Sequence, residues 1–166
     1  VRVFDVHEPA DGPPFLVMEL LLGEDLRRCL ARRRQLPLDR ALRLAFQAGT
    51  ALHVAHQRGV IHRDLKPSNL FLAWEQRDDQ IIEQAKVIDF GVSRRHGDPR
   101  LTAEHQPVGT PRYMAPEQAR GLQADERTDQ FALGAVFFEM LAGRPLFADE
   151  PIDALLRRIA EAGPAD

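Results

Sequence analysis

The 166-residue sequence predicts an α+β fold, because two pairs of strand patterns occur together with several helix patterns. Apolar and polar residues alternate over residues 1–6, and residues 15–22 are apolar apart from Glu19, which predicts two strands joined by a loose hairpin. Apolar residues recur at helical spacing over residues 38–58, which predicts the longest helix. Hydrophobic residues make up 44% of the chain, enough for one domain with its own core.

Shorter patterns define the elements between these segments. Gly23 or Asp25 should stand near the start of a short amphipathic helix. A second strand pair is expected at residues 70–74 and 85–88, and the polar segment 75–84 between them should be a solvated excursion. The sheet content is therefore expected to be small.

Two further helices are expected toward the C-terminus. An apolar helix should run over residues 131–142, with Asp129 as its N-cap and Gly143 at its end. Residues 151–162 have the spacing of an amphipathic helix. Helices should thus dominate the last third of the chain.

The composition argues against several functional classes. The formal net charge is −3, so the chain lacks the basic character of nucleic-acid binding, and no nucleic-acid partner is expected. The longest apolar run, residues 131–141, is interrupted by Gly134 and Glu139 and is too short for a membrane segment. There is no signal peptide, and the single Cys29 excludes an intramolecular disulfide, so we expect a cytoplasmic protein. The chain opens on a strand pattern without Met, which suggests a segment of a longer protein.

The residues best suited to chemistry are concentrated in residues 60–70. Asp64, Lys66 and Asn69 lie within six residues of one another, and Pro67 argues against a continuous helix there. Short apolar segments flank this stretch, so a loop with polar side chains would be held on a rigid base. The loop combines a proton acceptor, a cation and a neutral oxygen ligand.

Three motifs follow one another along the chain. They are His62-Arg63-Asp64-Leu65 with Asn69, then Asp89-Phe90-Gly91, and then Ala115-Pro116-Glu117. One of them alone would mean little, but with all three the chain resembles a serine/threonine protein kinase, in particular the bacterial relatives of the eukaryotic kinases. The resemblance runs nearly end to end along the chain.

This resemblance implies a protein-kinase-like fold that consists mainly of the helical C-lobe. Residues 1–22 would be a remnant of the N-lobe and the hinge, and residues 23–166 would be a C-lobe that is incomplete at its C-terminus. The implied cofactors are ATP and Mg²⁺, and the implied partners are protein substrates with Ser or Thr acceptors.

The resemblance also assigns catalytic roles to residues of the loop. Asp64 would accept the proton of the substrate hydroxyl, and Lys66 would stabilise charge on the transferred phosphate. Asn69 and Asp89 would bind Mg²⁺ through oxygen atoms. Thr110 would contact Asp64 and Lys66 and help to select a hydroxyl substrate. Lys66 indicates Ser or Thr as the acceptor, because tyrosine kinases differ at this position.

Nucleotide contacts are implied in and after the hinge. Met18 would guard the back of the pocket, while the carbonyl of Glu19 and the amide of Leu21 would bind adenine. Glu24 would reach the ribose, and Phe71 would form the floor beneath adenine. Each has an alternative: the hinge residues could be a buried strand, Glu24 could be a first-turn acid that meets the helix dipole, and Phe71 could be ordinary core.

A regulatory contact and two architectural contacts are implied as well. Arg63 would bind a phosphate on Thr102, which would otherwise be an ordinary exposed loop residue. Asp129 would hydrogen-bond the backbone of the catalytic loop, if it is not simply an N-cap. His62 and Phe90 would stack on each other.

The sequence departs from the family pattern at both ends. It contains no G-x-G-x-x-G phosphate loop, and its two lysines, Lys66 and Lys86, do not lie where the N-lobe lysine belongs. Glu117 should be under-paired, because the helices that supply its arginine partner are not in the chain. These departures predict that residues 1–166 alone transfer phosphate weakly or not at all.

Two functional classes therefore remain. The chain is either part of an active serine/threonine kinase or a non-catalytic kinase-like binding module. The complete set Asp64, Lys66, Asn69 and Asp89 favours the first, since a scaffold has no chemical need for all four. A small-molecule kinase is disfavoured, because such proteins lack the segment from residue 109 to residue 117.

Overall fold

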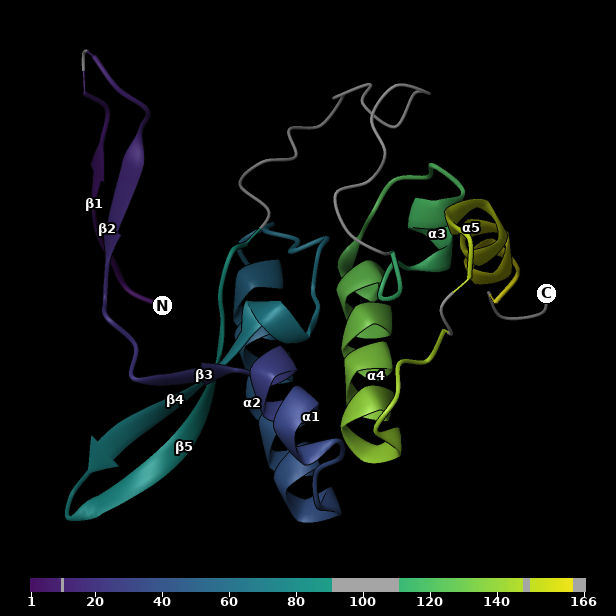
Figure 1. Cartoon of the computed structure of the whole chain (residues 1–166). Helices are drawn as coiled ribbons and strands as arrows, with labels where there is room; N and C mark the ends of the chain where they lie inside the picture. Colours follow the sequence, from purple (N-terminus) through teal and green to yellow (C-terminus); the bar gives the residue numbers. More distant parts are fainter. Residues whose placement is uncertain (10, 91–110, 148–149, 163–166) are drawn as a thin grey trace.

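The computed structural model describes residues 1–9, 11–90, 111–147 and 150–162, and it confirms the α+β class (Figure 1). The strands form a two-stranded sheet and a three-stranded sheet, and the helices follow or flank the second. In chain order the elements are β1 (Val3–His7), β2 (Phe15–Met18), β3 (Gly23–Asp25), α1 (Leu26–Arg33), α2 (Leu38–His56), the 3₁₀-helix η1 (Pro67–Asn69), β4 (Leu70–Arg77), β5 (Gln80–Val87), α3 (Pro116–Ala119), α4 (Glu126–Ala142) and α5 (Ile152–Glu161).

The expected N-terminal hairpin is formed by β1 and β2, which pair antiparallel and stand apart from the helices in Figure 1. Its apolar side chains are exposed, including Phe4 at 58% and Met18 at 45%. A two-stranded sheet cannot cover its own side chains. The alternative of a buried strand at Met18 is therefore wrong.

The second sheet has the order β3-β4-β5, and its last two strands are longer than expected. The register continues without a break from Leu70 opposite Val87 to Arg77 opposite Gln80. The solvated excursion expected at residues 75–84 is thus wrong: these residues are the outer half of a hairpin (Figure 1).

The charged residues of this outer half are compatible with strands because they have partners. Arg40 of α2 binds Glu83 of β5 through two hydrogen bonds, Nε to Oε2 at 2.8 Å and Nη2 to Oε1 at 2.5 Å. Asp78 begins the turn with a positive φ of 50°, which Asp tolerates better than most residues. The polarity of the segment therefore reflects ion pairing and a tight turn, rather than a loose loop.

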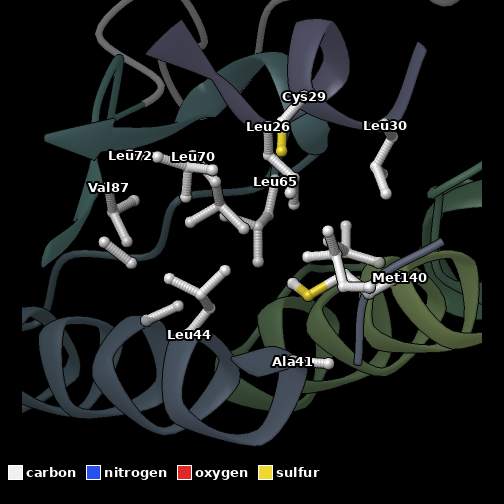
Figure 2. Packing of buried hydrophobic residues seen from close by; sticks show 14 of the residues in the cluster. Leu26, Cys29, Leu30, Ala41, Leu44, Leu65, Leu70, Leu72, Val87 and Met140 are labelled. Atoms are coloured by element: carbon white, nitrogen blue, oxygen red, sulfur yellow. The ribbon is translucent and has the colours of Figure 1, made fainter. Parts of the chain in front are cut away.

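The core lies between one face of this sheet and the helices α1, α2 and α4 (Figure 2). Leu70 and Leu72 of β4 point into it and are each 1% exposed, whereas Phe71 between them faces the other side of the sheet. Leu65 of the loop before β4 is only 2% exposed and enters the same core. Other buried members are Leu26, Cys29, Leu30, Ala41, Leu44, Val87 and Met140.

Gly23 is required where β3 passes β4. Its φ is +147°, and a Cβ placed there would lie 2.0 Å from the backbone oxygen of Leu72. Gly59, just beyond α2, also has a positive φ, of +71°, but no atom lies within 4 Å of a Cβ built on it. Comparing Gly23 with Gly59 therefore separates the cost of steric overlap from the cost of backbone strain.

We expect Gly23→Ala to lower the free energy of unfolding by about 2–3 kcal/mol, because β4 must move in addition to the strain at a positive φ. The matched control Gly59→Ala should cost about 1–2 kcal/mol, from strain alone. Urea titration followed by circular dichroism measures both. Equal losses for the two variants would contradict the close approach of Gly23 to β4.

The apolar helix α4 begins earlier than expected. Its N-cap is Asp125, whose Oδ1 accepts a hydrogen bond from the backbone N of Arg127 at 2.8 Å. Asp129 lies inside the first turn and is fully buried, so the assignment of Asp129 as N-cap is wrong. Gly143 ends the helix with a φ of 68°, as expected.

The remaining helices agree with the sequence. Asp25 is the N-cap of α1, where its Oδ1 accepts from the backbone N of Arg28 at 2.9 Å. The long helix α2 and the amphipathic helix α5 lie where their periodicity placed them. Among the helices of the described residues, none combines the length and the apolar character that crossing a membrane requires.

Candidate active site

The catalytic loop, defined here as residues 62–69, is attached to the helical core through the buried carboxylate of Asp129. Asp129 Oδ1 accepts a hydrogen bond from the backbone N of Arg63 at 2.8 Å, and Oδ2 accepts from the backbone N of His62 at 2.9 Å. His56 Nε2 also donates to Oδ2, at 2.7 Å. The expectation that Asp129 hydrogen-bonds the loop backbone is therefore confirmed.

His62 joins the same loop to the end of β5. Its Nδ1 accepts a hydrogen bond from the backbone N of Asp64 at 3.3 Å, so the proton of the neutral ring is on Nε2, which donates to the backbone O of Ile88 at 3.0 Å. The ring also contacts Phe90, with centroids 5.0 Å apart and a tilt of 54°. The two rings are in contact, as expected, in a tilted arrangement.

The loop presents Asp64 and Lys66 to solvent on either side of the buried Leu65. Lys66 Nζ lies 2.7 Å from Asp64 Oδ2, and the Asp64 side chain is 49% exposed. Asn69, which ends η1, donates from Nδ2 to the backbone O of Asp64 at 2.8 Å. Asn69 thus holds the backbone of Asp64, while the Asp64 carboxylate remains accessible.

Asn69 and Asp89 are brought together by the pairing of β4 with β5. The backbone N of Ile88, the neighbour of Asp89, donates to the backbone O of Asn69 at 3.0 Å. Asp89 is exposed, and its φ is +57°. The φ of Arg63 is likewise positive, at 66°. A positive φ stores strain of about 1–3 kcal/mol in a residue such as Arg63, which is typical of functional sites, whereas Asp tolerates this region better.

The oxygen donors at this point suit Mg²⁺. This ion is commonly bound by one or two protein oxygen ligands together with substrate phosphates. Asp89 offers an anionic oxygen and Asn69 a neutral one, and both belong to segments fixed by backbone hydrogen bonds. Within the described ranges, no three His, Cys, Asp or Glu side chains gather into a metal site, so a cage of protein ligands alone is not supported there.

Residues 115–118 contact the catalytic loop from the other side. Gln118 Nε2 donates to the backbone O of Arg63 at 2.8 Å, and its Oε1 accepts from the backbone N of Ala115 at 3.1 Å. Glu117 Oε1 accepts from Thr128 Oγ1 at 2.5 Å. Glu117 therefore has a hydroxyl partner on α4, although the sequence suggested an under-paired acid.

A second contact between this region and α4 involves Tyr113. Its hydroxyl donates to Glu139 Oε2 at 2.6 Å. Burial, and then the hydrogen bond to Glu139, raise the pKa of the Tyr113 hydroxyl above its usual value of 10.0. Tyr113 therefore remains a hydrogen-bond donor at neutral pH.

The model of the protein kinase domain family matches residues 1–162. The chain belongs to this family. It is similar to the serine/threonine-protein kinase pkn3 of Myxococcus xanthus, with 36% identity over 99% of this chain and 30% of the relative. It is also similar to a probable serine/threonine-protein kinase of Clostridium acetobutylicum (35%, 98% and 24%) and to PknB of Mycobacterium leprae (36%, 97% and 26%). The chain thus spans between 24% and 30% of the length of these relatives.

The residues that were expected to contact a nucleotide lie in the second sheet and in the segment before it. Glu19 and Leu21 lie in the segment between β2 and β3, which we call the hinge segment (residues 19–22). Glu24 lies in β3, and Arg32 binds its carboxylate at 2.9 and 2.5 Å. These hydrogen bonds lower the pKa of Glu24. The alternative that Glu24 is a first-turn acid is wrong, because it precedes the N-cap Asp25.

Two expected residues lie outside the part of the chain that the structure describes, and three residues without an expected role contact the site. Thr102 and Thr110 lie outside the described residues, so their roles stay predictions. Lys86, Glu75 and Gln118, for which the sequence indicated no role, contact the segments around the site. The contacts of Lys86 depend on the pairing of β4 with β5 and on the position of the segment before β3, and that of Gln118 depends on where α3 packs against the loop.

Proposed function

We propose that the protein containing this chain transfers the phosphoryl group of ATP to Ser or Thr hydroxyl groups of protein substrates. One observation carries the proposal: an accessible Asp64 carboxylate with the Lys66 ammonium group 2.7 Å away, on a loop whose Asn69 is hydrogen-bonded through its backbone to Ile88, the neighbour of Asp89. This arrangement puts a proton acceptor, a cation and two oxygen ligands at one end of the sheet. The names of the relatives support the same reaction.

The geometry supports the following roles. Asp64 orients the substrate hydroxyl and accepts its proton, because its carboxylate is exposed while its backbone is held by Asn69. Lys66 stabilises negative charge at the transferred group. Asn69 and Asp89 would hold Mg²⁺, which would neutralise negative charge on the phosphates of ATP, the donor of the phosphoryl group.

Other assignments belong to the same proposal. Residues 1–22 act as the end of the N-lobe and the hinge, and residues 23–166 as the C-lobe. Adenine is bound by Glu19 and Leu21 of the hinge segment, with Met18 behind it and Phe71 beneath it. The half-buried position of Phe71, on the sheet face opposite the core, supports its place beneath adenine.

Three further residues complete the proposal. Glu24 contacts the ribose only after a ribose hydroxyl replaces one of the two hydrogen bonds that Arg32 donates to the Glu24 carboxylate. Thr110 helps to select a hydroxyl substrate, and Arg63 binds phosphorylated Thr102. The reaction takes place in the cytoplasm, which supplies ATP.

The test uses the full-length protein, radiolabelled ATP, Mg²⁺ and a mixture of Ser- and Thr-containing peptides. We expect labelling by the wild type, and about 10²- to 10³-fold less by Asp89→Asn, together with weaker Mg²⁺-dependent nucleotide binding. Asn tolerates the positive φ of residue 89, so the variant removes the charge without forcing the backbone to change.

The matched control is Asp79→Asn, the same substitution in the exposed turn between β4 and β5. It should leave labelling and binding unchanged. Nucleotide binding without any labelling by the wild type would refute the proposal and favour a non-catalytic binding module. Equal labelling by Asp89→Asn and the wild type would remove Asp89 as a metal ligand.

A further inference from the structure

Lys86 of β5 links the neighbouring strand β4 to the hinge segment, whose Glu19 stands 67 residues earlier in the chain. Its Nζ lies 2.8 Å from Glu75 Oε1 in β4, and 3.2 and 3.4 Å from the two carboxylate oxygens of Glu19 in the hinge segment. The Lys86 side chain is only 18% exposed. An ammonium group carries three donors in a compact cation, so it can bridge two carboxylates at once.

Strand register puts this bridge on the nucleotide side of the sheet. Phe71 is directly opposite Lys86, and residues directly opposite each other in antiparallel strands point to the same face. Glu75 lies four residues beyond Phe71 on the same strand and therefore on that face too. The other face, with Leu70 and Val87, forms the core. Lys86 thus borders Phe71, beneath the proposed position of adenine.

The hinge segment has backbone anchors at its two ends. The backbone N of Glu19 donates to the backbone O of Arg2 at 2.9 Å, which joins it to the β1–β2 hairpin. The backbone O of Leu22 accepts from the backbone N of Trp74 at 2.7 Å, which joins it to β4. Leu20, between these anchors, is 89% exposed. The Glu19 carboxylate therefore adds a side-chain connection from the start of the hinge segment to the sheet.

The charges of the bridge suit a permanent contact at neutral pH. The hydrogen bonds that Lys86 donates to Glu75 and then to Glu19 raise the pKa of Lys86. The hydrogen bond from the backbone N of Arg2 and the contacts with Lys86 lower the pKa of Glu19, so both partners are charged over a wide pH range. Neither side chain has to change its protonation state to hold the hinge segment.

We propose that Lys86 is a positioning residue of the nucleotide site. Its ammonium group ties Glu19 of the hinge segment to Glu75 of β4, and this tie sets the position of the hinge backbone above Phe71. This inference rests on the proposed function, because it concerns how well the hinge segment accepts adenine. It gives the outer half of the β4–β5 hairpin a role, since Glu75 belongs to it.

The test compares Lys86→Met with the wild type in the full-length protein; Met keeps an unbranched apolar chain and removes the charge. We expect KM for ATP to rise about threefold to fivefold, in line with the loss of a partly exposed ion pair, while kcat and KM for the peptide stay within twofold. Hydrogen exchange at the amides of residues 20–22 should become faster. Lys86→Arg should restore the wild-type values.

Two further variants make the result specific. Glu19→Gln should match Lys86→Met, and the double variant should be no worse than either single variant, because both break the same contact. The matched control Arg158→Met breaks an ion pair with Glu150 at the start of the α5 segment and should leave KM for ATP unchanged.

Three outcomes would overturn the inference. The first is an unchanged KM for ATP in Lys86→Met, even with lower thermal stability, since the bridge would then be only structural. The second is a higher KM in Lys86→Met but not in Glu19→Gln, which would mean that Lys86 contacts the nucleotide itself. The third is unchanged hydrogen exchange in residues 20–22. A wild type that transfers no phosphate would instead refute the proposed function. Hydrogen exchange would still show whether the contacts of Lys86 with Glu19 and Glu75 position the hinge segment.

Discussion

Turnover should fall by about 10²- to 10⁴-fold when Asp64 is replaced by asparagine, while the affinity for ATP and Mg²⁺ stays unchanged. Asparagine cannot accept the proton of the substrate hydroxyl. The loop itself should not move, because Asn69 binds the backbone oxygen of Asp64 and not its carboxylate. Steady-state kinetics of the full-length protein give kcat, and titration with a fluorescent nucleotide gives the affinity.

The contrast with Asp89→Asn makes this result informative. Asp64 acts on the acceptor, so its loss should spare Mg²⁺-dependent nucleotide binding, which Asp89→Asn should weaken. Asp153→Asn, in the first turn of α5, is a control for an acid that has no role in the reaction. A loss of less than tenfold in Asp64→Asn, or equal and mild effects of Asp64→Asn and Asp89→Asn on kcat, would contradict the assigned roles.

The free energy of unfolding should fall by about 3–5 kcal/mol in Asp129→Ala, because this change leaves buried donors without their acceptor. The donors are the backbone N–H groups of His62 and Arg63 and the Nε2 of His56. Phosphoryl transfer should also be lost, since the backbone of the catalytic loop is then no longer held against α4. Denaturant titration measures the stability, and peptide labelling measures the transfer.

Asp125→Ala is the matched control for this prediction. Asp125 and Asp129 are both acids at the start of α4, but Asp125 only caps the helix. Its removal should cost about 1 kcal/mol, a typical value for an N-cap, and should leave the rate of labelling unchanged. Similar losses of stability and activity in the two variants would mean that Asp129 acts only through the helix.

Local chemistry made much of this chain predictable from its sequence alone. Helical spacing is repeated along α2 and α5, so their positions could be predicted from the order of apolar and polar residues. The loop with Asp64, Lys66 and Asn69 is short, and its residue types and spacing follow directly from the chain. For that reason the family, the α+β class and the main candidate residues could be stated without the structure.

Contacts between distant segments were decided only by the tertiary structure. Asp125 and Asp129 are equally good caps by residue type, and the partner of Asp129 lies 66 or 67 residues away in the catalytic loop. The outer half of the β4–β5 hairpin is polar. Its strands form because β4 and β5 stay in register and because Arg40 of α2 binds Glu83.

The same reason applies to Lys86, whose partners Glu19 and Glu75 stand 67 and 11 residues away along the chain. Sequence patterns show which face of an element is apolar, because that depends on local periodicity. They do not show which polar side chains meet, since this depends on strand register and on how helices and sheet pack together. The bridge between the hinge segment and the sheet is therefore a property of the folded chain.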